Sequence, residues 1–172
     1  MNTLIAVLQL LVAAAFLSIP LVRSRYGAVA TAGAEAELRR QGVRPTVLAE
    51  NGMRFDAGGH ETWAPVSIAA VMAGVAAFNF ADHSWSHPLT WVFQSIVLAI
   101  NVVILYSNLT ATRSVQAAFA RKGDPMLARI DVPALLKAAE AGFPSWVWIL
   151  QNARHVVVFG ASAVALATLF TA

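Results

Sequence analysis

The residues best suited to metal chemistry lie together in one short polar segment between two apolar runs. Asp82, His83 and His87 supply one carboxylate and two imidazoles within six residues. His83 and His87 are four residues apart, which is the spacing that lets one face of a helix chelate a metal ion. Pro88 disfavours a continuous helix through His87, which weakens this indication. A third ligand must be Asp82, a water molecule or a group from another chain. The segment therefore indicates a zinc or copper site, and the alternative is a set of solvated interface residues or a partner contact.

A second group of polar residues forms a stripe along the third apolar run. Its members recur every seven residues and are His87, Gln94, Asn101 and Asn108. Seven residues are almost two helical turns, so the stripe stays within about 60° of one side of a helix. One hypothesis is a polar path or binding surface along the interior of a helix bundle. The other is helix association through amide hydrogen bonds, with Gln9 and Asn79 as partners on neighbouring runs.

Gln151, Arg154 and His155 form the third candidate group, and Arg154 is the only cation in an apolar run. Their three- and four-residue spacing places the amide and the imidazole on one helical face. If the run begins at Trp146, Arg154 lies about 12 Å inside the hydrocarbon, where a charge is costly and indicates contact with an anionic lipid head group or another ligand. If the hydrocarbon part begins at Val156, Arg154 is an interfacial anchor. The long reach of the Arg side chain favours this second interpretation.

Four apolar runs must position these groups. The chain is 58% hydrophobic and 12% charged, a composition that predicts burial of apolar surface in lipid. Each run is long enough to cross roughly 30 Å of hydrocarbon as a helix. The runs are Leu4 to Val22, Ala64 to Ala81, Leu89 to Ser107 and Trp146 to Thr171. We therefore predict an all-α fold, with residues 1–172 as a single polytopic domain built on a four-helix transmembrane bundle.

Basic residues are distributed unevenly between the connections. Eleven of the twelve Lys and Arg residues lie in the segments 23 to 63 and 107 to 144, and the 82 to 88 turn has none. Short basic loops stay on the cytoplasmic side during membrane insertion. The distribution predicts a multi-pass protein of the cytoplasmic (inner) membrane with both termini outside (N-out/C-out). A bacterial source is inferred from ten Arg against two Lys and from the alanine-rich runs.

The two basic segments are predicted to form structure beyond the membrane. The first helix continues to a stop at Gly42, and the third continues to Lys122. Residues 47–56 alternate around Asn51-Gly52, the dipeptide best suited to a type I′ turn. This pattern predicts a small cytoplasmic β-hairpin.

Apolar residues recur at helical spacing over 132–142, after Asp131 as a helix cap. The segment leads into Trp146 and Trp148, which suit the aromatic belt of a membrane. This arrangement predicts an interfacial amphipathic helix lying in the head-group plane. The alternative is a helix packed on the protein itself.

Small residues mark one face of the second apolar run. They are spaced by three and four residues and are Ala70, Gly74, Ala77 and Ala81. Such a face permits close approach of another helix backbone and is usually a packing surface.

The composition also excludes several classes of function. Because the chain has no cysteine, disulfides, thiolate metal sites, iron–sulfur clusters and cysteine nucleophiles are excluded. The basic charge lies in the loops without a groove of interleaved aromatic residues, so it gives no support for nucleic-acid binding. The runs contain no Asp or Glu, and Asp82 lies directly after the end of the second run. This argues against a proton- or sodium-coupled transporter.

We therefore predict a small integral membrane protein that acts as a structural or accessory subunit of a bacterial membrane complex. Its expected partners are the lipid bilayer and other membrane subunits or copies of itself. One alternative is a homo-oligomeric channel or facilitator lined by the stripe from His87 to Asn108. The other is a membrane enzyme or redox subunit with a metal site at Asp82, His83 and His87.

Overall fold

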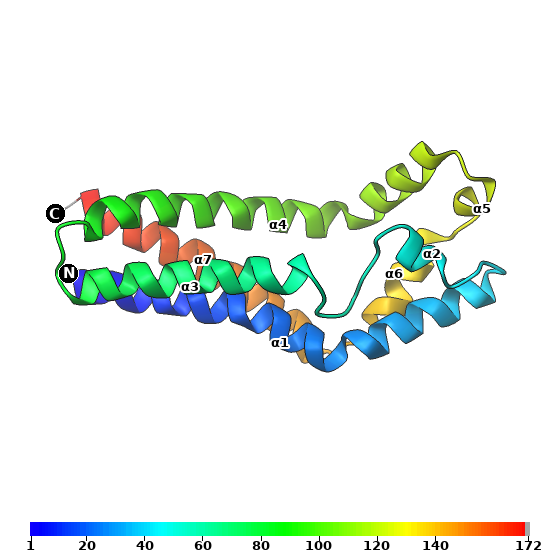
Figure 1. The fold of residues 1–172 in the computed structure, drawn as a ribbon, viewed down its shortest axis with the longest axis horizontal. Helices are drawn as coiled ribbons and strands as arrows, with labels where there is room; N and C mark the ends of the chain where they lie inside the picture. The colour runs from blue at the N-terminus through cyan, green and yellow to red at the C-terminus, as the bar shows by residue number, and fades with distance from the viewer. Residues whose placement is uncertain (171–172) are drawn as a thin grey trace. The chain divides into compact units, whose positions relative to one another are not determined.

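Helix is the only regular secondary structure in the part of the chain that is described. A computed structural model describes residues 1–170, apart from the side chains of His60 and Glu61. The helices are α1 Asn2–Arg40, α2 Val47–Glu50, α3 His60–Phe80, α4 Ser86–Lys122, α5 Pro125–Ala128, α6 Val132–Glu140 and α7 Trp146–Phe170 (Figure 1). Helices α1, α3, α4 and α7 each contain a segment long and apolar enough to cross a membrane. The predicted all-α class and the four predicted spans are confirmed as helices.

The described residues pack as two compact units. The bundle unit comprises Met1–Leu21, Gly59–Leu105 and the chain from Trp148 onward. The basic unit comprises Val22–Gly58 and Tyr106–Val147, and it contains eleven of the twelve Lys and Arg residues. Helices α1 and α4 contribute to both units because they run for 39 and 37 residues without a break.

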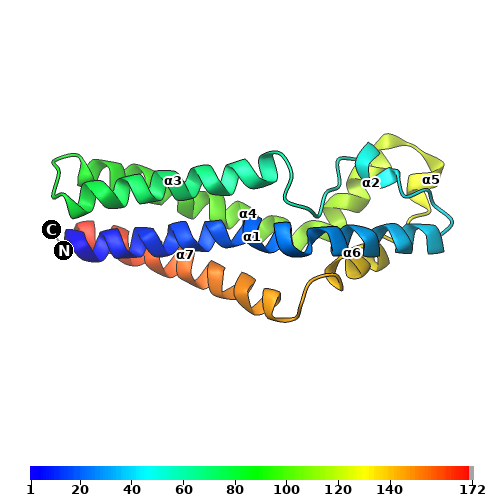
Figure 2. The same cartoon turned by 60° about the horizontal axis from the view of Figure 1, so that its bottom comes forward.

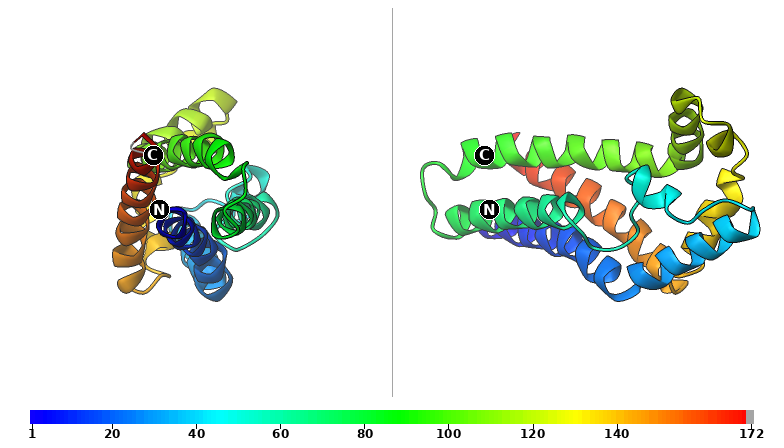
Figure 3. Two further views of the ribbon diagram at one scale, coloured as in Figure 1. Left: turned by 90° about the vertical axis from the view of Figure 1, so that its left-hand side faces the viewer. Right: turned by 45° about the vertical axis from the view of Figure 1, so that its right-hand side comes forward.

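The bundle unit is packed around apolar side chains from all four of its helices. Val12 and Phe16 of α1, Met72 of α3, Val97 of α4 and Val158 of α7 are each at most 3% exposed. The end-on view in Figure 3 shows these helices beside one another. The N-terminus, the turn between α3 and α4 and the end of α7 lie at the same end of this unit (Figures 1 and 2). The four spans therefore alternate in direction.

The two long helices end where glycine was predicted to stop them. After α1, Gly42 has a φ of +71°, and the N–H of Val43 donates to the carbonyl of Leu38 at 2.8 Å. This bond, made across a left-handed residue, is the Schellman cap that satisfies carbonyls at a helix end. Helix α4 ends at Lys122, and Gly123 follows with a φ of +65°.

Residues 47–56 do not form the predicted β-hairpin. Helix α2 occupies the start of this segment, and the N–H of Met53 donates to the carbonyl of Leu48 at 2.8 Å across Gly52. The φ of +66° at Gly52 suits this Schellman cap as well as it suits a type I′ turn. Val47 and Leu48 are both buried, whereas neighbours in a strand point to opposite faces. Burial of two adjacent residues therefore selects a helical turn over a strand.

The helix predicted over 132–142 is present as α6, and its apolar face packs on the protein. The Asp131 carboxylate accepts a hydrogen bond from the N–H of Ala134 at 3.0 Å, which confirms the predicted cap. Leu135 and Ala139 are at most 2% exposed and belong to the core of the basic unit. The prediction of an interfacial helix is therefore not supported, and the alternative of packing on the protein itself describes α6.

Glycines explain why α1 and the end of α6 approach so closely. A Cβ added to Gly33 would lie 2.7 Å from the carbonyl oxygen of Ala138. A Cβ added to Gly142 would lie 2.5 Å from both the Cα and the backbone nitrogen of Ala30. Real Cβ atoms do not approach backbone this closely, so both contacts require glycine.

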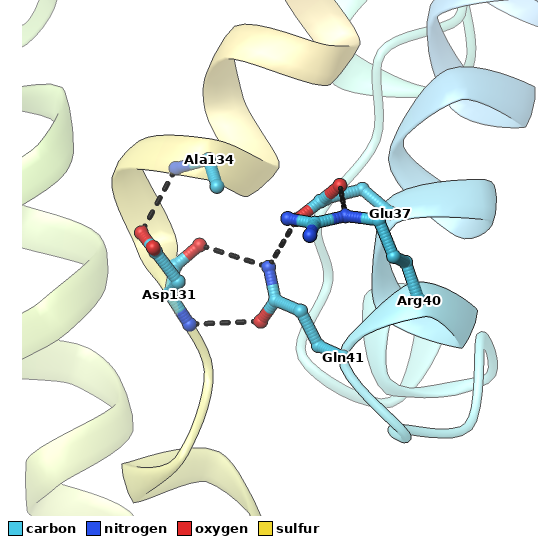
Figure 4. Close-up of polar contacts among 5 residues, drawn as sticks. All are labelled: Glu37, Arg40, Gln41, Asp131 and Ala134. Carbon is cyan, nitrogen blue, oxygen red and sulfur yellow. Dashed lines mark hydrogen bonds and ion pairs between the residues drawn. The ribbon is translucent and has the colours of Figure 1, made fainter.

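Polar side chains add a clamp between the end of α1 and the start of α6 (Figure 4). The Gln41 amide bonds twice to the backbone of Asp131: its Oε1 accepts from the N–H at 2.8 Å, and its Nε2 donates to the carbonyl at 3.3 Å. Gln41 Nε2 also donates to Glu37 Oε1 at 2.6 Å. The Arg40 guanidinium donates to both carboxylate oxygens of Glu37, at 2.6 and 2.7 Å. Glu37 therefore orients the amide that holds Asp131.

Gly142→Ala should destabilise the basic unit by about 1–3 kcal/mol, because the added methyl group overpacks the contact with α1. Thermal unfolding in detergent, followed by circular dichroism, measures the change. Gly160→Ala is the matched control, because its Cβ would meet nothing within 4 Å in α7 and alanine is the better helix former. Equal melting temperatures for the two variants would contradict the close packing described above.

The Glu37 cluster predicts sensitivity to acid. Hydrogen bonds from Arg40 and Gln41 lower the pKa of Glu37 from 4.5 to about 2. Because the folded-state pKa is depressed, this stabilisation is present above pH 4.5 and is lost as the pH falls toward 2. Glu37→Gln should flatten the dependence of melting temperature on pH in this window. Glu35→Gln, which removes only an exposed pair with Arg39, should keep the wild-type dependence.

Candidate functional site: a polar seam inside the bundle

Three of the four residues of the predicted polar stripe belong to a seam on the inward face of α4. The seam residues alternate at spacings of three and four, the 3.5-residue repeat of a helix that faces its neighbours. They are His87, Thr90, Gln94, Val97, Asn101 and Ile104. Thr90, Gln94 and Asn101 are at most 1% exposed. The prediction included every second position and missed Thr90, although its spacing from His87 was a readable signal.

The first buried layer of the seam joins three helices. Asn79 Nδ2 of α3 donates to Thr90 Oγ1 of α4 at 2.9 Å and to Gln9 Oε1 of α1 at 3.1 Å. Gln9 Nε2 donates to Thr90 Oγ1 at 3.1 Å. All three side chains are at most 1% exposed. The expected partners Gln9 and Asn79 therefore take part in interhelix bonding, but with Thr90 in place of a stripe residue.

The next two layers join α4 to α7. Gln94 Nε2 donates to Ser162 Oγ at 2.8 Å. Asn101 Oδ1 lies 3.2 Å from His155 Nδ1, which donates when that ring nitrogen carries the proton. Asn101 follows Gln94 by seven residues and His155 precedes Ser162 by seven, so both bonds belong to one antiparallel register.

Apolar side chains separate the two layers between α4 and α7. Val97 and Val158 lie between them along the helices, and both are at most 3% exposed. Each of the three buried layers also contains one amide atom that makes no hydrogen bond to protein. These atoms are Asn79 Oδ1, Gln94 Oε1 and Asn101 Nδ2. The polar groups therefore form separate joints between helices and do not form a continuous polar path.

The four stripe residues are not brought together as one surface. Gln94 and Asn101 lie in the buried interior of the bundle unit, and His87 is half-buried at its end. Asn108 is exposed and belongs to the basic unit. Only the middle of the predicted stripe is thus interior.

The turn between α3 and α4 is a Schellman cap that has an aspartate in the position usually taken by glycine. Asp82 has a φ of +49°, and the N–H of His83 donates to the carbonyl of Phe78 at 3.1 Å. The His83 ring packs edge-on against Phe78 with centroids 5.1 Å apart, and its Nδ1 accepts from the N–H of Trp85 at 3.2 Å. His83 therefore serves the helix cap that forms this turn.

Asn2 of α1 joins the other two predicted metal ligands. Its Nδ2 donates to Asp82 Oδ1 at 2.6 Å, and its Oδ1 lies 3.1 Å from His87 Nε2. Among the described residues, no group of three or more His, Cys, Asp or Glu side chains is placed to hold a metal ion. Asn2 was missed by sequence reasoning, because nothing in the local sequence shows that α1 begins beside this turn.

The third predicted group, Gln151, Arg154 and His155, does not form one site, because only His155 is bonded inside the bundle unit. His155 is 8% exposed and contacts Asn101. Gln151 and Arg154 are half-buried, and neither makes a side-chain hydrogen bond or ion pair in the part of the chain that the structure describes. Gln151 and Arg154 thus remain candidates for contact with another molecule.

Asn79→Ala should destabilise the bundle unit by about 0.6–2 kcal/mol, because it removes the donor that joins α3 to α1 and α4. Unfolding in mixed detergent micelles measures this change. Asn152→Ala removes an exposed amide from α7 and should leave stability within about 0.5 kcal/mol of wild type. If Asn79→Ala were as stable as Asn152→Ala, the seam would not be holding the helices together.

No known protein family model matches the chain, and no curated protein or solved structure matches it. The functional argument therefore rests on the residues of this chain.

Proposed function

We propose that this protein is a structural or accessory subunit of a bacterial membrane complex. The observation that carries the proposal is the use of the buried polar groups: those of α1, α3, α4 and α7 are engaged in bonds between neighbouring helices. Such bonds are the expected use of amides inside a membrane bundle. With the interior committed to joining helices, the outer surfaces remain for interaction with partners.

The proposed orientation places the basic unit in the cytoplasm and both termini outside. Eleven of the twelve Lys and Arg residues belong to the basic unit, and short basic segments are retained inside during insertion. The turn between α3 and α4 has no Lys or Arg. This distribution supports the cytoplasmic membrane as the location of the protein.

An outward-facing seam of small residues on α3 supports close contact with another helix. Its members are all exposed, are spaced by three and four residues, and are Ser67, Ala70, Gly74, Ala77 and Ala81. A Cβ added to Gly74 would meet nothing within 4 Å, so this face is not used for packing inside the chain. Small residues at this spacing let two backbones approach closely in lipid.

The two alternative functions receive less support from the geometry. A channel lined by the stripe would need those side chains to face a wet path, whereas Gln94 and Asn101 bond to α7 with Val97 between them. A metal enzyme would need Asp82, His83 and His87 to converge, whereas the Asn2 amide bonds to both Asp82 and His87, and His83 accepts from the backbone of Trp85.

Extraction of the chain from native membranes in mild detergent tests the proposal. Size analysis and quantitative mass spectrometry should identify membrane subunits that migrate with the chain in a fixed ratio. A chain that migrates alone, as a monomer or only with copies of itself, would contradict an accessory role in a larger complex.

Gly74→Leu should reduce recovery of such a subunit by about tenfold, if the bulky side chain costs about 1.4 kcal/mol of helix packing. The fold should tolerate it, because the position is open. Ala99→Leu is the matched control on the exposed surface of α4 and should keep wild-type recovery. Equal recovery from both variants would show that the α3 seam is not the contact surface.

A further inference from the structure

Arg154 is a cation in the bundle unit that makes no ion pair with the side chains described by the structure. Its spacing of four residues from Val158 and eight from Ser162 places it toward the inward side of α7, where both of those residues are buried. Arg154 itself is half-buried, and its guanidinium forms no ion pair with a side chain that the structure describes. A charge at this place in a membrane helix is costly unless an anion or water reaches it.

The hydrogen bonds between α4 and α7 determine how deep Arg154 lies. The neighbouring residue His155 contacts Asn101, which is fifteen residues from the start of α4 at Ser86. At 1.5 Å per residue, this level is about 22 Å from that end of α4. If a hydrocarbon layer of roughly 30 Å begins level with Ser86, about 8 Å of it lies between Arg154 and the opposite membrane face.

The direction of the side chain shortens this remaining distance. Side chains on a helix tilt toward its N-terminus, and α7 begins at Trp146, so the Arg154 side chain extends toward the nearer membrane face. Gln151 lies one turn closer to that face and on the same side of α7. A long Arg side chain can place its charge at the head-group level while its stem stays among apolar groups.

Apolar side chains next to this cation are open to lipid. Val157 and Val164 follow Arg154 by three and ten residues, which places both on one side of it around α7. Val157 is half-buried, Val164 is 48% exposed, and Trp148 is also exposed. An indole at the end of a membrane span favours the head-group level. The cation and these accessible aliphatic side chains therefore follow one side of a single helix, which suits a ligand that combines a negative charge with an acyl chain.

We propose that Arg154 and Gln151 bind the phosphate of an anionic phospholipid whose acyl chains lie along Val157 and Val164. The Arg154 guanidinium supplies the positive charge and a planar set of donors that matches phosphate oxygens. The Gln151 amide supplies a further donor. His155 takes no part, because its ring nitrogen is held by Asn101.

The test measures lipid binding to the full chain in detergent by native mass spectrometry, with phosphatidylglycerol and phosphatidylcholine of identical acyl chains as probes. Wild type should prefer phosphatidylglycerol, and Arg154→Gln should reduce that preference by about fivefold, the fold-change expected for one basic residue at a membrane surface. Arg154→Lys, which keeps the charge, should retain most of the preference. Arg113→Gln removes an exposed cation from the basic unit and should match wild type.

Three results would overturn the proposal. The first is an unchanged preference in Arg154→Gln, and the second is an equal loss in Arg113→Gln, which would indicate a general charge effect. The third is displacement of the lipid by glycerol phosphate at the same concentration, which would show that a free phosphate suffices. If Arg154→Gln does not fold, weakening of the wild-type preference on raising salt from 0.05 to about 0.5 M supports the proposal, and no weakening overturns it.

Discussion

A polar side chain inside a lipid-embedded bundle must find its hydrogen-bond partner within the bundle, and this constraint organises the bundle unit. Lipid provides no competing donors or acceptors, and apolar contact between helices gains little because the acyl chains are equally apolar. In the α4 seam, each buried polar residue bonds to a side chain of a neighbouring helix. Thr90 serves α1 and α3, while Gln94 and Asn101 serve α7.

The same layers fix the relative positions of the helices along their axes. The bonds of Gln94 and Asn101 to α7 share one register, and sliding either helix by one residue would break both. The amide atoms left without a protein partner limit the net stabilisation from each layer. The main effect of these interhelix hydrogen bonds is therefore to select one arrangement of the helices, as buried polar residues do in coiled coils.

Helix termination is the second recurring device, and it uses one hydrogen-bond pattern at three places. The ends of α1, α2 and α3 each carry a left-handed residue followed by an N–H that bonds back five residues. Gly42 and Gly52 supply that conformation without strain. Asp82 supplies it at a cost, and its carboxylate is held by Asn2.

The sequence predicted the features that depend on local pattern and could not predict those that depend on register. Apolar length identified the spans, and Gly42, Gly123 and Asp131 marked ends or caps correctly. The dipeptide Asn51-Gly52 led to the wrong prediction of a β-hairpin, because a hairpin turn and a helix cap require the same backbone conformation at Gly52.

The hydrogen-bond partners of the buried and capping polar residues were another feature that the local sequence pattern could not reveal. Ser162 and Asn2 are unremarkable in sequence and became partners only because antiparallel packing set them opposite Gln94 and Asp82. The apolar face of α6 was visible in the sequence. Whether it meets lipid or protein depended on Gly142 and on Gly33 of α1, which lies far from α6 along the chain.

The most direct test of the seam as a set of interhelix joints is a double-mutant cycle on Gln94 and Ser162. Unfolding free energies of Gln94→Ala, Ser162→Ala and the double variant give the coupling between the two side chains. A structural joint predicts a favourable coupling of about 0.6 kcal/mol, the average found for hydrogen bonds between membrane helices, and at most about 1.7 kcal/mol. A coupling near zero would contradict the central claim that these polar residues hold the bundle together.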